Sequence, residues 1–286
     1  MATVAELNEP DHTIQWCPGC GDFGIVVSVR AAISNLGLEP EKVCIVSGVG
    51  CSGKLPHYVK TYGFEGLHGR ALPPATAIKL ANHELTVIAV GGDGDGYGIG
   101  LGHFMHTLRR NVDISYIVHN NGVYGLTTGQ TSPTSVKGYQ SKSTPHGVLE
   151  EPINPLALAI AGGATFVARG YSGDMKHLTW LIEESVKHRG FALIDVLQPC
   201  VTYNKTQTYA FYQQRCYKLT PENHNKADFK AAFEKANEWG DKIPIGIFYQ
   251  VSKPTHEEGL PQIKDKPLVK QDISNVDISA ILDEYV

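Results

Sequence analysis

Residues 85–101 have the sequence LTVIAVGGDGDGYGIGL, in which an apolar run leads directly into alternating glycine and aspartate. The run Leu85–Val90 is short and rich in β-branched residues, which is typical of a strand buried on both faces of a sheet. The glycines of residues 92–98 favour a tight turn, and an apolar pattern of helical spacing begins at Leu101. This stretch therefore predicts a buried strand, a Gly-rich turn and a helix.

The same alternation of patterns extends on both sides of this stretch, from about residue 23 to residue 196. Further apolar runs predict buried strands at Val43–Val46, Ile114–Val118, Thr165–Ala168 and Phe191–Val196. A helical pattern around Leu178–Val186 follows an aspartate, a residue type that caps helices. Alternating strands and helices form βαβ units, whose helices cover both faces of a mostly parallel sheet. We therefore expect a doubly wound α/β fold, with a mixed α+β domain as the alternative.

Composition and charge exclude several classes of protein. The chain has 286 residues, 42% of them hydrophobic. No apolar run approaches the ~20 residues that a membrane helix needs. The net charge of -4 and the lack of a basic block argue against nucleic acid as a partner. The first twenty residues lack the basic start and apolar stretch of a secretory signal, so we expect a cytoplasmic protein.

Two segments depart from the alternating pattern. Residues 124–151 are polar and rich in Gly and Pro, and a long segment of this kind in a compact domain is often functional. After residue 200 the chain becomes polar and irregular, with one helical pattern near Lys226–Glu238 and a charged tail. We expect an α/β domain over residues 1–200, and an arm over residues 201–286 that is not a second domain.

The aspartates of the Gly-rich turn predict a metal ion. Asp93 and Asp95 lie where an open parallel sheet binds phosphate groups. Carboxylates would repel a diphosphate unless a divalent cation lay between them, so the turn predicts a magnesium site. A second oxygen ligand is expected from a neighbouring strand end, and the run Ile114–Val118 is followed closely by Asn120 and Asn121. The alternative is an ordinary strand-to-helix turn with two solvated aspartates.

Four of the six cysteines have positions that suggest a shared site. Cys17 and Cys20 form a Cys-x-x-Cys pair, which is typical of a thioredoxin-like redox pair or of half a soft-metal site. Residues 1–15 offer no preceding strand, which thioredoxin requires, so we favour the metal site. Cys51 and Cys200 each follow a predicted strand, so all four thiolates can converge at one edge of the sheet. Four cysteines suit a 4Fe–4S cluster or structural zinc.

These motifs resemble those of known families. Gly92-Asp93-Gly94, with Asn121 following 28 residues after Asp93, resembles the thiamine diphosphate and magnesium motif of thiamine-dependent enzymes. An ordered set of motifs, from residue 16 to about residue 257, resembles the β subunit of 2-oxoacid:ferredoxin oxidoreductases. The motifs of this set are Trp16-Cys17-Pro18-Gly19-Cys20-Gly21, Gly50-Cys51-Ser52-Gly53-Lys54, His68-Gly69-Arg70-Ala71, Gly92-Asp93-Gly94-Asp95, Asn120-Asn121, Thr128-Gly129-Gln130, Gln198-Pro199-Cys200 and Phe248-Tyr249.

The resemblance implies a fold and a set of ligands. It implies the diphosphate-binding half of a thiamine diphosphate-binding fold, with magnesium held by Asp93, the Asn121 side chain and the Val123 carbonyl. It also implies that a 4Fe–4S cluster is held by Cys17, Cys20, Cys51 and Cys200. The other residues that it places at the cofactor are His68, Gly92, Gly94, Asp95, Gly125, Leu126 and Thr127.

The resemblance also implies a reaction and partners. In this family a 2-oxoacid is oxidatively decarboxylated, electrons pass through an iron–sulfur cluster to ferredoxin, and coenzyme A accepts the acyl group. The glutamate that activates thiamine diphosphate belongs to a pyrimidine-binding domain, whereas residues 23–196 account for one doubly wound unit. An α subunit is therefore expected to supply it, in an αβ or (αβ)2 assembly, with residues 201–286 packed on that subunit.

Two residues bear on the choice of substrate. Lys54 follows Cys51 by three residues, and its ammonium group suits the distal carboxylate of 2-oxoglutarate; the alternative is a surface lysine. By the resemblance, Leu126 stands where pyruvate-specific relatives usually carry Asn. We expect Lys54 and Leu126 to belong to the catalytic site and 2-oxoglutarate to be favoured, with pyruvate as the alternative.

Other classes of function use only part of these residues. A thiamine-dependent decarboxylase or synthase without a cluster would use residues 92–121 but would leave the four cysteines unexplained. A zinc-stabilised scaffold would explain the cysteines but would leave Asp93 and Asn121 without a role. A thioredoxin-type oxidoreductase requires only Cys17 and Cys20.

Overall fold

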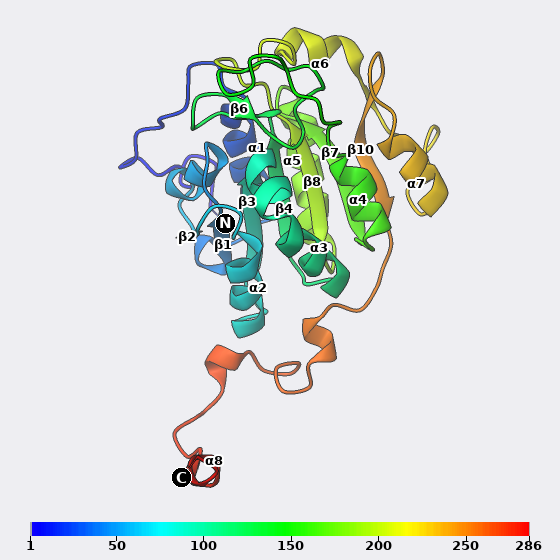
Figure 1. Ribbon diagram of the computed structural model, residues 1–286. Coiled ribbons are helices and arrows are strands. Elements are labelled where there is room, and N and C mark those ends of the chain that lie inside the picture. Colours follow the sequence, from blue (N-terminus) through cyan, green and yellow to red (C-terminus); the bar gives the residue numbers. More distant parts are fainter. Residues whose placement is uncertain (1, 286) are drawn as a thin grey trace.

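An eight-stranded sheet forms the centre of the molecule, which is described here as a computed structural model covering residues 2–285 (Figure 1). The strands are β1 (Val43–Ser47), β2 (Tyr62–Glu65), β3 (Thr86–Gly92), β4 (Ser115–Asn120), β7 (Phe166–Tyr171), β8 (Ala192–Leu197), β9 (Cys216–Lys218) and β10 (Ile243–Gln250). Their order is β2-β1-β3-β4-β8-β7-β10-β9. From β2 to β7 all neighbours in this order are parallel, whereas β10 runs antiparallel to β7.

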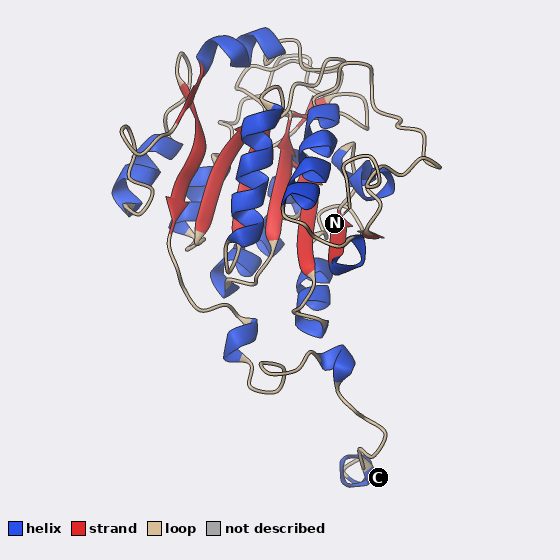
Figure 2. Cartoon of the chain, turned by 180° about the vertical axis from the view of Figure 1, so that it is seen from behind, coloured by secondary structure: helices blue, strands red, loops and turns tan. Residues whose placement is uncertain are grey.

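Helices cover both faces of this sheet (Figures 1 and 2). One face is covered by α1 (Asp22–Asn35) and α5 (Met175–Lys187), and the other by α2 (Leu72–Ala81), α3 (Leu101–Arg110), α4 (Pro155–Ala161) and α7 (Phe229–Ala236). Successive strand residues point to opposite faces, so within β1 Ile45 joins the core under α1 and Val46 joins the core under α3. The prediction of a doubly wound α/β fold is confirmed.

Four neighbouring strands bring the sequence motifs to one edge of the sheet. β1, β3, β4 and β8 lie side by side and run in the same direction. Their carboxyl ends therefore meet, and they are followed by residues 48–51, 92–96, 121–124 and 198–200. Two short strands, β5 (Val123–Tyr124) and β6 (Gln130–Thr131), pair in the loop after β4. The long polar segment 124–151 begins in this hairpin and adjoins the same edge.

The prediction of an irregular segment after residue 200 is wrong for much of its length. β10 pairs with β7 inside the sheet, β9 pairs with β10, and α6 (Tyr209–Arg215) precedes β9. The helix predicted near residues 226–238 is α7. The apolar pattern misses β10 because Pro244 and Gly246 interrupt it, and both residue types are depleted in strands. The sequence pattern also misses β2, a short edge strand whose residues are all exposed.

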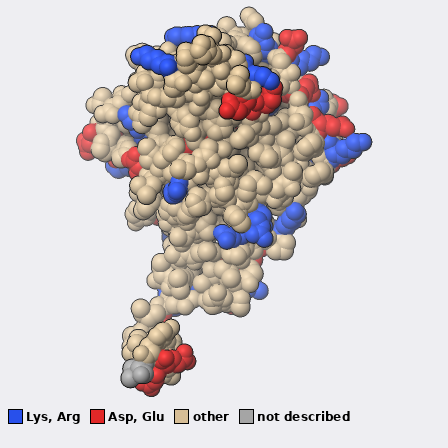
Figure 3. Space-filling model, in the orientation of Figure 1, with Lys and Arg blue, Asp and Glu red and all other residues tan. Residues whose placement is uncertain are grey.

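The last part of the chain extends away from the sheet, on the side opposite the motif-bearing edge (Figure 1). Residues 264–285 carry exposed apolar side chains, among them Ile273 and Tyr285, which are 77% and 86% exposed. The remaining short helices are η1 (Pro40–Lys42), η4 (Glu257–Gly259), η5 (Leu268–Lys270) and α8 (Ser279–Asp283). Charged residues of both signs are scattered over the face seen in Figure 3. Nowhere between residues 2 and 285 does a helix combine the length and the apolar character needed to span a bilayer.

Candidate active site

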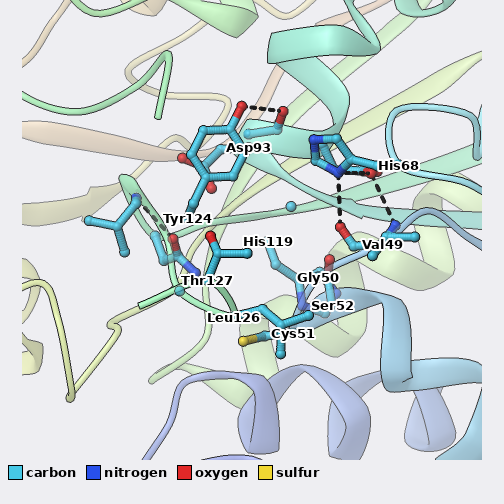
Figure 4. Close-up of a pocket in the computed structure, with 16 residues that line it drawn as sticks. Val49, Gly50, Cys51, Ser52, His68, Asp93, His119, Tyr124, Leu126 and Thr127 are labelled. Carbon is cyan, nitrogen blue, oxygen red and sulfur yellow. Dashed lines mark hydrogen bonds and ion pairs between the residues drawn. The ribbon is translucent and has the colours of Figure 1, made fainter. Parts of the chain in front are cut away.

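A cavity of about 670 Å3, including its open mouth, lies at the carboxyl ends of β1, β3 and β4 (Figure 4). Its walls are formed largely by the loops that follow these strands, and we call it the Asp93 cavity. It brings together every residue that the sequence resemblance places at the cofactor: His68, Gly92, Asp93, Gly94, Asp95, Asn121, Val123, Gly125, Leu126 and Thr127.

The Gly-rich turn packs tightly against two tyrosines. After Asp93 the chain forms η3 (Gly94–Ile99), one π-helical turn that leads into α3. A Cβ atom on Gly94 would lie 2.3 Å from Tyr124 Cε1, and one on Gly96 would lie 2.1 Å from the Tyr116 hydroxyl. Only glycine allows such an approach without displacing these rings. The Tyr124 hydroxyl also donates a hydrogen bond to the Gly94 carbonyl at 3.0 Å (Figure 4).

Asp93 is a buried carboxylate in the wall of the Asp93 cavity. Its Oδ2 accepts hydrogen bonds from the Ser132 and Thr134 hydroxyls, both at 2.5 Å. Burial raises the pKa of Asp93 to about 6, although these hydroxyls and the Asn121 N–H oppose the rise. A cation bound beside Asp93 would favour the charged form of this carboxyl. The site therefore combines a preorganised carboxylate with an environment that leaves its charge uncompensated by basic side chains.

The predicted oxygen ligands for magnesium lie within one loop and the neighbouring turn. Asn121 Oδ1 accepts the Val123 N–H at 3.0 Å, which closes a tight turn directly after β4. The Asn204 side chain donates a hydrogen bond to the Asn121 carbonyl at 2.8 Å and fixes this turn from the other side. A carboxylate, an amide oxygen and a backbone carbonyl are the hard oxygen ligands that magnesium prefers. The types of donor at Asp93, Asn121 and Val123 therefore fit this ion.

The Asp95 carboxylate contacts other protein groups, whereas a simple diphosphate contact would face the ligand. Its Oδ1 accepts the Gly69 N–H at 2.6 Å and the Val49 N–H at 3.1 Å, and lies 3.1 Å from His68 Nδ1. Among residues 2–285, Oδ2 has no hydrogen-bond partner, and burial raises the pKa of Asp95. Asp95 thus ties the loop after β1 and the loop before α2 to the Gly-rich turn.

His68 lines the mouth of the Asp93 cavity (Figure 4). Its Nδ1 lies 3.2 Å from the Val49 carbonyl oxygen and 3.1 Å from Asp95 Oδ1, so a hydrogen on Nδ1 serves both acceptors. The neighbouring Arg70 does not line the cavity and donates to the His68 carbonyl at 3.0 Å. The imidazole is therefore held in place, with its second nitrogen available to a ligand.

The four predicted cysteine ligands line a second cavity, of about 660 Å3 including its mouth, which we call the cysteine cavity. It is formed in part by Cys17, Cys20, Cys51 and Cys200, all of which are free thiols. A Cβ atom on Gly125 would lie 3.6 Å from Cys51 Sγ and 3.7 Å from Cys200 Sγ. Sulfurs from two different strand ends therefore lie around the same glycine, as the strand order predicts.

The surroundings of these thiols bear on which metal they fit. Cys20 Sγ lies 3.2 Å from Gln198 Nε2 and 3.3 Å from Asp22 Oδ2, and burial raises the pKa of Cys20 strongly and that of Cys51 to about 12. Within the described part of the chain, no three His, Cys, Asp or Glu side chains are placed to share a single metal ion. Zinc would require the four sulfurs to converge on one ion, whereas a 4Fe–4S cluster spans more space between its four cysteines.

The two predicted substrate residues both reach the cysteine cavity. Lys54 lies in η2 (Ser52–Tyr58), and its ammonium group donates to Gln15 Oε1 at 2.9 Å. Leu126 is 48% exposed and lines the cysteine cavity and the Asp93 cavity. The two cavities share a wall made of Cys51, Asn121, Gly125 and Leu126.

Several residues of the site escape the sequence motifs. Ser132 and Thr134 lie in the polar segment expected to be functional, but hydroxyl residues in a loop carry no specific signal. A second example is a pair of buried side chains, in which His119 Nδ1 lies 2.7 Å from Asp22 Oδ1. His119 lines the Asp93 cavity, and between residues 2 and 285 its Nε2 has no hydrogen-bond partner. The only hints in the sequence are the position of His119 beside Asn120-Asn121 and that of Asp22 beside the Cys17-x-x-Cys20 pair.

Two known protein families match consecutive segments of the chain. Residues 48–196 match the family described as "Thiamine pyrophosphate enzyme, C-terminal TPP binding domain". Residues 200–265 match the family described as the C-terminal part of the pyruvate ferredoxin oxidoreductase beta subunit. The first match starts directly after β1 and covers β3 and β4, whose ends help to form the Asp93 cavity, and the second begins at Cys200.

Individual proteins are similar over most of the chain. The 2-oxoacid:ferredoxin oxidoreductase subunit beta of Saccharolobus solfataricus is 54% identical over 248 residues, which cover 82% of this chain and 81% of that protein. The 2-oxoglutarate oxidoreductase subunit KorB of Mycobacterium tuberculosis is 46% identical over 194 residues, or 68% of this chain and 52% of that protein. A solved 2-oxoglutarate:ferredoxin oxidoreductase from Magnetococcus marinus, with 2-oxoglutarate, coenzyme A and succinyl-CoA bound, matches with a TM-score of 0.91 at 38% identity, covering 100% of this chain and 96% of that one. The chain thus belongs to the β subunits of the 2-oxoacid:ferredoxin oxidoreductases, a family of oxidoreductases.

Proposed function

We propose that this β subunit, together with an α subunit, oxidatively decarboxylates a 2-oxoacid with coenzyme A and passes the electrons through a 4Fe–4S cluster to ferredoxin. The observation that supports this most directly is the wall shared by the Asp93 cavity and the cysteine cavity, which includes Cys51 and Asn121. A cofactor in the first cavity would lie directly beside an electron acceptor in the second. Such proximity is what transfer of electrons out of a decarboxylated substrate requires.

We assign thiamine diphosphate and magnesium to the Asp93 cavity. Thiamine diphosphate, when bound, supplies the electron sink that lets carbon dioxide leave a 2-oxoacid. Asp93, the Asn121 side chain and the Val123 carbonyl would hold the magnesium ion. Ser132 and Thr134 would keep the Asp93 carboxylate in one orientation through their hydrogen bonds. Gly92 and Gly94 line the cavity beside these ligands.

The other residues around the Asp93 cavity would orient and enclose this cofactor. Asp95 and Val49 fix the His68 ring through Nδ1, so in the doubly protonated form of this side chain Nε2–H would donate a hydrogen bond to the diphosphate. Gly125, Leu126 and Thr127 form the loop on the side toward the cysteine cavity. Asp95 would act through the loops that it braces.

We assign a 4Fe–4S cluster to Cys17, Cys20, Cys51 and Cys200. These thiols bind iron as thiolates, so cluster insertion would release their protons. The Gln198 amide beside Cys20 Sγ is placed to donate a hydrogen bond to a bound thiolate, an interaction that raises the reduction potential of such clusters.

We propose that 2-oxoglutarate is favoured over pyruvate. Lys54 lines the cysteine cavity next to Leu126, and its ammonium group could replace the bond to Gln15 by an ion pair with the distal carboxylate of this substrate. The similar structure from Magnetococcus marinus contains 2-oxoglutarate and succinyl-CoA, which supports the same choice. Pyruvate is the alternative, in keeping with the pyruvate-linked family matched by residues 200–265.

The proposal requires a set of partners. The α subunit would bring the pyrimidine-binding domain with its glutamate, in an αβ or (αβ)2 assembly, and the C-terminal extension would pack on it. Ferredoxin would accept the electrons, and the complex would work in the cytoplasm. The scattered charges of both signs in Figure 3 do not single out a docking surface for ferredoxin.

The experiment that tests this function is metal analysis and turnover of the complex purified without oxygen. We expect about four iron and four acid-labile sulfide per β subunit. We also expect ferredoxin reduction that depends on coenzyme A and is more efficient with 2-oxoglutarate than with pyruvate. Zinc, or no metal, would contradict the electron path, whereas iron with a strong preference for pyruvate would contradict only the substrate.

A further inference from the structure

A third cavity, of about 890 Å3 including its mouth, lies between β7, β8, α7 and residues 151–155, and we call it the Arg169 cavity. The residues predicted to hold the cofactor, the cluster or the substrate line other cavities, although Thr134, which supports Asp93, also reaches this one. Most of its wall is apolar or uncharged, and Arg169 and Asp195 lie in its base. It is therefore a separate space with a buried charged pair that the proposed reaction does not use.

Arg169 has hydrogen-bond donors to spare. The side chain is 3% exposed, and in the part of the chain that the structure describes its Nε and Nη1 have no hydrogen-bond partner. The guanidinium carbon lies 5.2 Å from the centroid of the Trp239 ring and 5.4 Å from that of the Phe248 ring. These rings hold the cation in place but accept no ordinary hydrogen bond. Leaving guanidinium N–H groups buried without acceptors is costly, so an acceptor in the cavity would be stabilising.

Asp195 does not satisfy this need. Its Oδ2 lies 3.7 Å from Arg169 Nε, which is beyond hydrogen-bond distance. The carboxylate is instead served by other donors, the Tyr97 hydroxyl at 3.0 Å and Asn120 Nδ2 at 3.1 Å and 3.3 Å. Asp195 offsets part of the charge of Arg169 without occupying its donors. A ligand of low charge that accepts hydrogen bonds fits this arrangement better than a highly charged anion.

The walls and the mouth of the cavity indicate the chemical character of the ligand beyond its hydrogen-bond acceptor. Apolar side chains in the wall are Val136, Pro152, Ile153, Pro155, Leu197 and Ala236. Trp239, which is 46% exposed, presents its ring at the mouth above Arg169. A phosphate dianion would be repelled by the buried Asp195, whereas a carboxylate carries one charge and matches the planar fork of a guanidinium.

We propose that the Arg169 cavity binds a small monocarboxylate with an apolar body. Its carboxylate would accept hydrogen bonds from Arg169, and its body would lie against Trp239 and the apolar wall. This site is distinct from the 2-oxoacid site proposed above, because Lys54 and Leu126 line other cavities.

The test uses benzoate as the probe and the purified complex of this chain with its α subunit. Calorimetry should show one saturable site per β subunit, with benzoate at least about tenfold tighter than its uncharged analogue benzamide. Binding should change the fluorescence of Trp239. The Trp239→Phe variant should lose that change, and the Trp180→Phe variant, which alters an exposed tryptophan on α5, should keep it. Equal binding of benzamide, no saturable binding of benzoate, or binding without a Trp239 signal would overturn the proposal.

A paired substitution tests the role of the buried cation. The double variant Arg169→Met with Asp195→Asn removes both charges, so no uncompensated charge is left buried. It should bind benzoate at least about tenfold more weakly while its affinity for benzamide is unchanged. Unchanged benzoate affinity in the folded double variant would overturn the proposal. If the double variant does not fold, the comparison of benzoate with benzamide on the unmodified complex still decides it.

Discussion

Asp93 and Asp95 lie in the same turn and are both buried, but their carboxylates contact different groups. Asp93 accepts only hydroxyl and backbone donors, whereas Asp95 lies beside His68 and accepts backbone N–H groups from two loops. A residue two positions away along a turn points to a different side, so sequence proximity does not imply a shared role. We therefore expect Asp93 to govern metal binding and Asp95 to govern the shape of the cavity.

The first prediction concerns the metal. Asp93→Asn should lower magnesium-dependent affinity for thiamine diphosphate by at least about 100-fold, because a neutral amide replaces the charged ligand. Thr134→Val removes only a supporting hydroxyl and should cost about 10- to 100-fold. Both are measured by calorimetry with excess magnesium, with the exposed Asp11→Asn as the control. Unchanged affinity in Asp93→Asn would contradict the assignment of magnesium.

The second prediction concerns the substrate. Lys54→Met should lower kcat/KM for 2-oxoglutarate by at least about tenfold, equivalent to about 1.4 kcal/mol, because the distal carboxylate loses its cation. The value for pyruvate should change little. Leu126→Asn should raise kcat/KM for pyruvate relative to 2-oxoglutarate. Lys60→Met, at an exposed lysine, is the control, and equal losses for both substrates in Lys54→Met would argue against a role in specificity.

At the scale of single elements, the Gly-rich turn and α5 show how packing limits the local sequence. Gly96 lies against Tyr116, whereas a Cβ atom on Gly102 of α3 would meet no atom within 4 Å outside its own stretch of helix. Packing therefore requires glycine at position 96 but not at position 102. In α5 a side chain caps the start of the helix, because Asp174 accepts the His177 N–H at 3.1 Å.

The third prediction uses the two glycines as a matched pair. Gly96→Ala should lower the free energy of unfolding by about 1–3 kcal/mol, because its Cβ would overlap the Tyr116 hydroxyl. Gly102→Ala should raise the free energy of unfolding by about 0.5–1 kcal/mol, because alanine has a higher helix propensity than glycine at an exposed helix position. Denaturant unfolding of the cofactor-free subunit measures both. Adding Tyr116→Phe to Gly96→Ala should recover part of the loss, and no recovery would mean that the strain lies elsewhere.

The fourth prediction concerns pH. Burial, with a contribution from Lys218, lowers the pKa of His177 to about 4, below its ordinary value of 6.5. The unfolded chain then binds more protons between these values, so the folded state loses stability as the pH falls from 6.5 to 4, by up to about 3 kcal/mol. His177→Gln should remove this part of the pH dependence. The exposed His106→Gln should retain it, and an unchanged profile in His177→Gln would refute the assignment.

For the molecule as a whole, the loops at the carboxyl edge of the sheet form the Asp93 cavity and the cysteine cavity. The C-terminal extension leaves from the opposite side (Figure 1). Residues 264–285 therefore take no part in forming these cavities. Apolar side chains that are 50–86% exposed, including Ile278 and Tyr285, are poorly suited to remain in water. We propose that they pack on the α subunit.

The fifth prediction follows from that separation. Deleting residues 272–286 should leave unfolding of the β subunit and its cofactor affinity unchanged, and should weaken association with the α subunit by at least about tenfold. Analytical ultracentrifugation of the two complexes measures the association. Replacing Asp283 and Glu284 by Asn and Gln alters the same segment without removing apolar area and should have little effect. A deletion that leaves association intact would show that the extension packs elsewhere.

Local patterns in the sequence were enough to predict the fold class and to place the motifs along the chain. The strand, turn and helix around residues 85–101 could be predicted because hydrophobic spacing and glycine act on neighbouring residues. The same local signals fail at β10, where Pro244 and Gly246 interrupt the pattern and pairing with β7 supplies the stability. The family of the chain also followed from the order of its motifs and is confirmed by the comparisons.

Which side chains meet depends on how the strands and loops are arranged in three dimensions. The order β1-β3-β4-β8 brings Cys51 and Cys200 around Gly125, although 148 residues separate the two cysteines in the sequence. It also puts Thr134 on Asp93 and leaves Arg169 facing a cavity of its own. Contacts of this kind depend on strand order and on loop paths, which the local pattern of residues does not encode. The roles of these residues thus remain predictions that the experiments above can test.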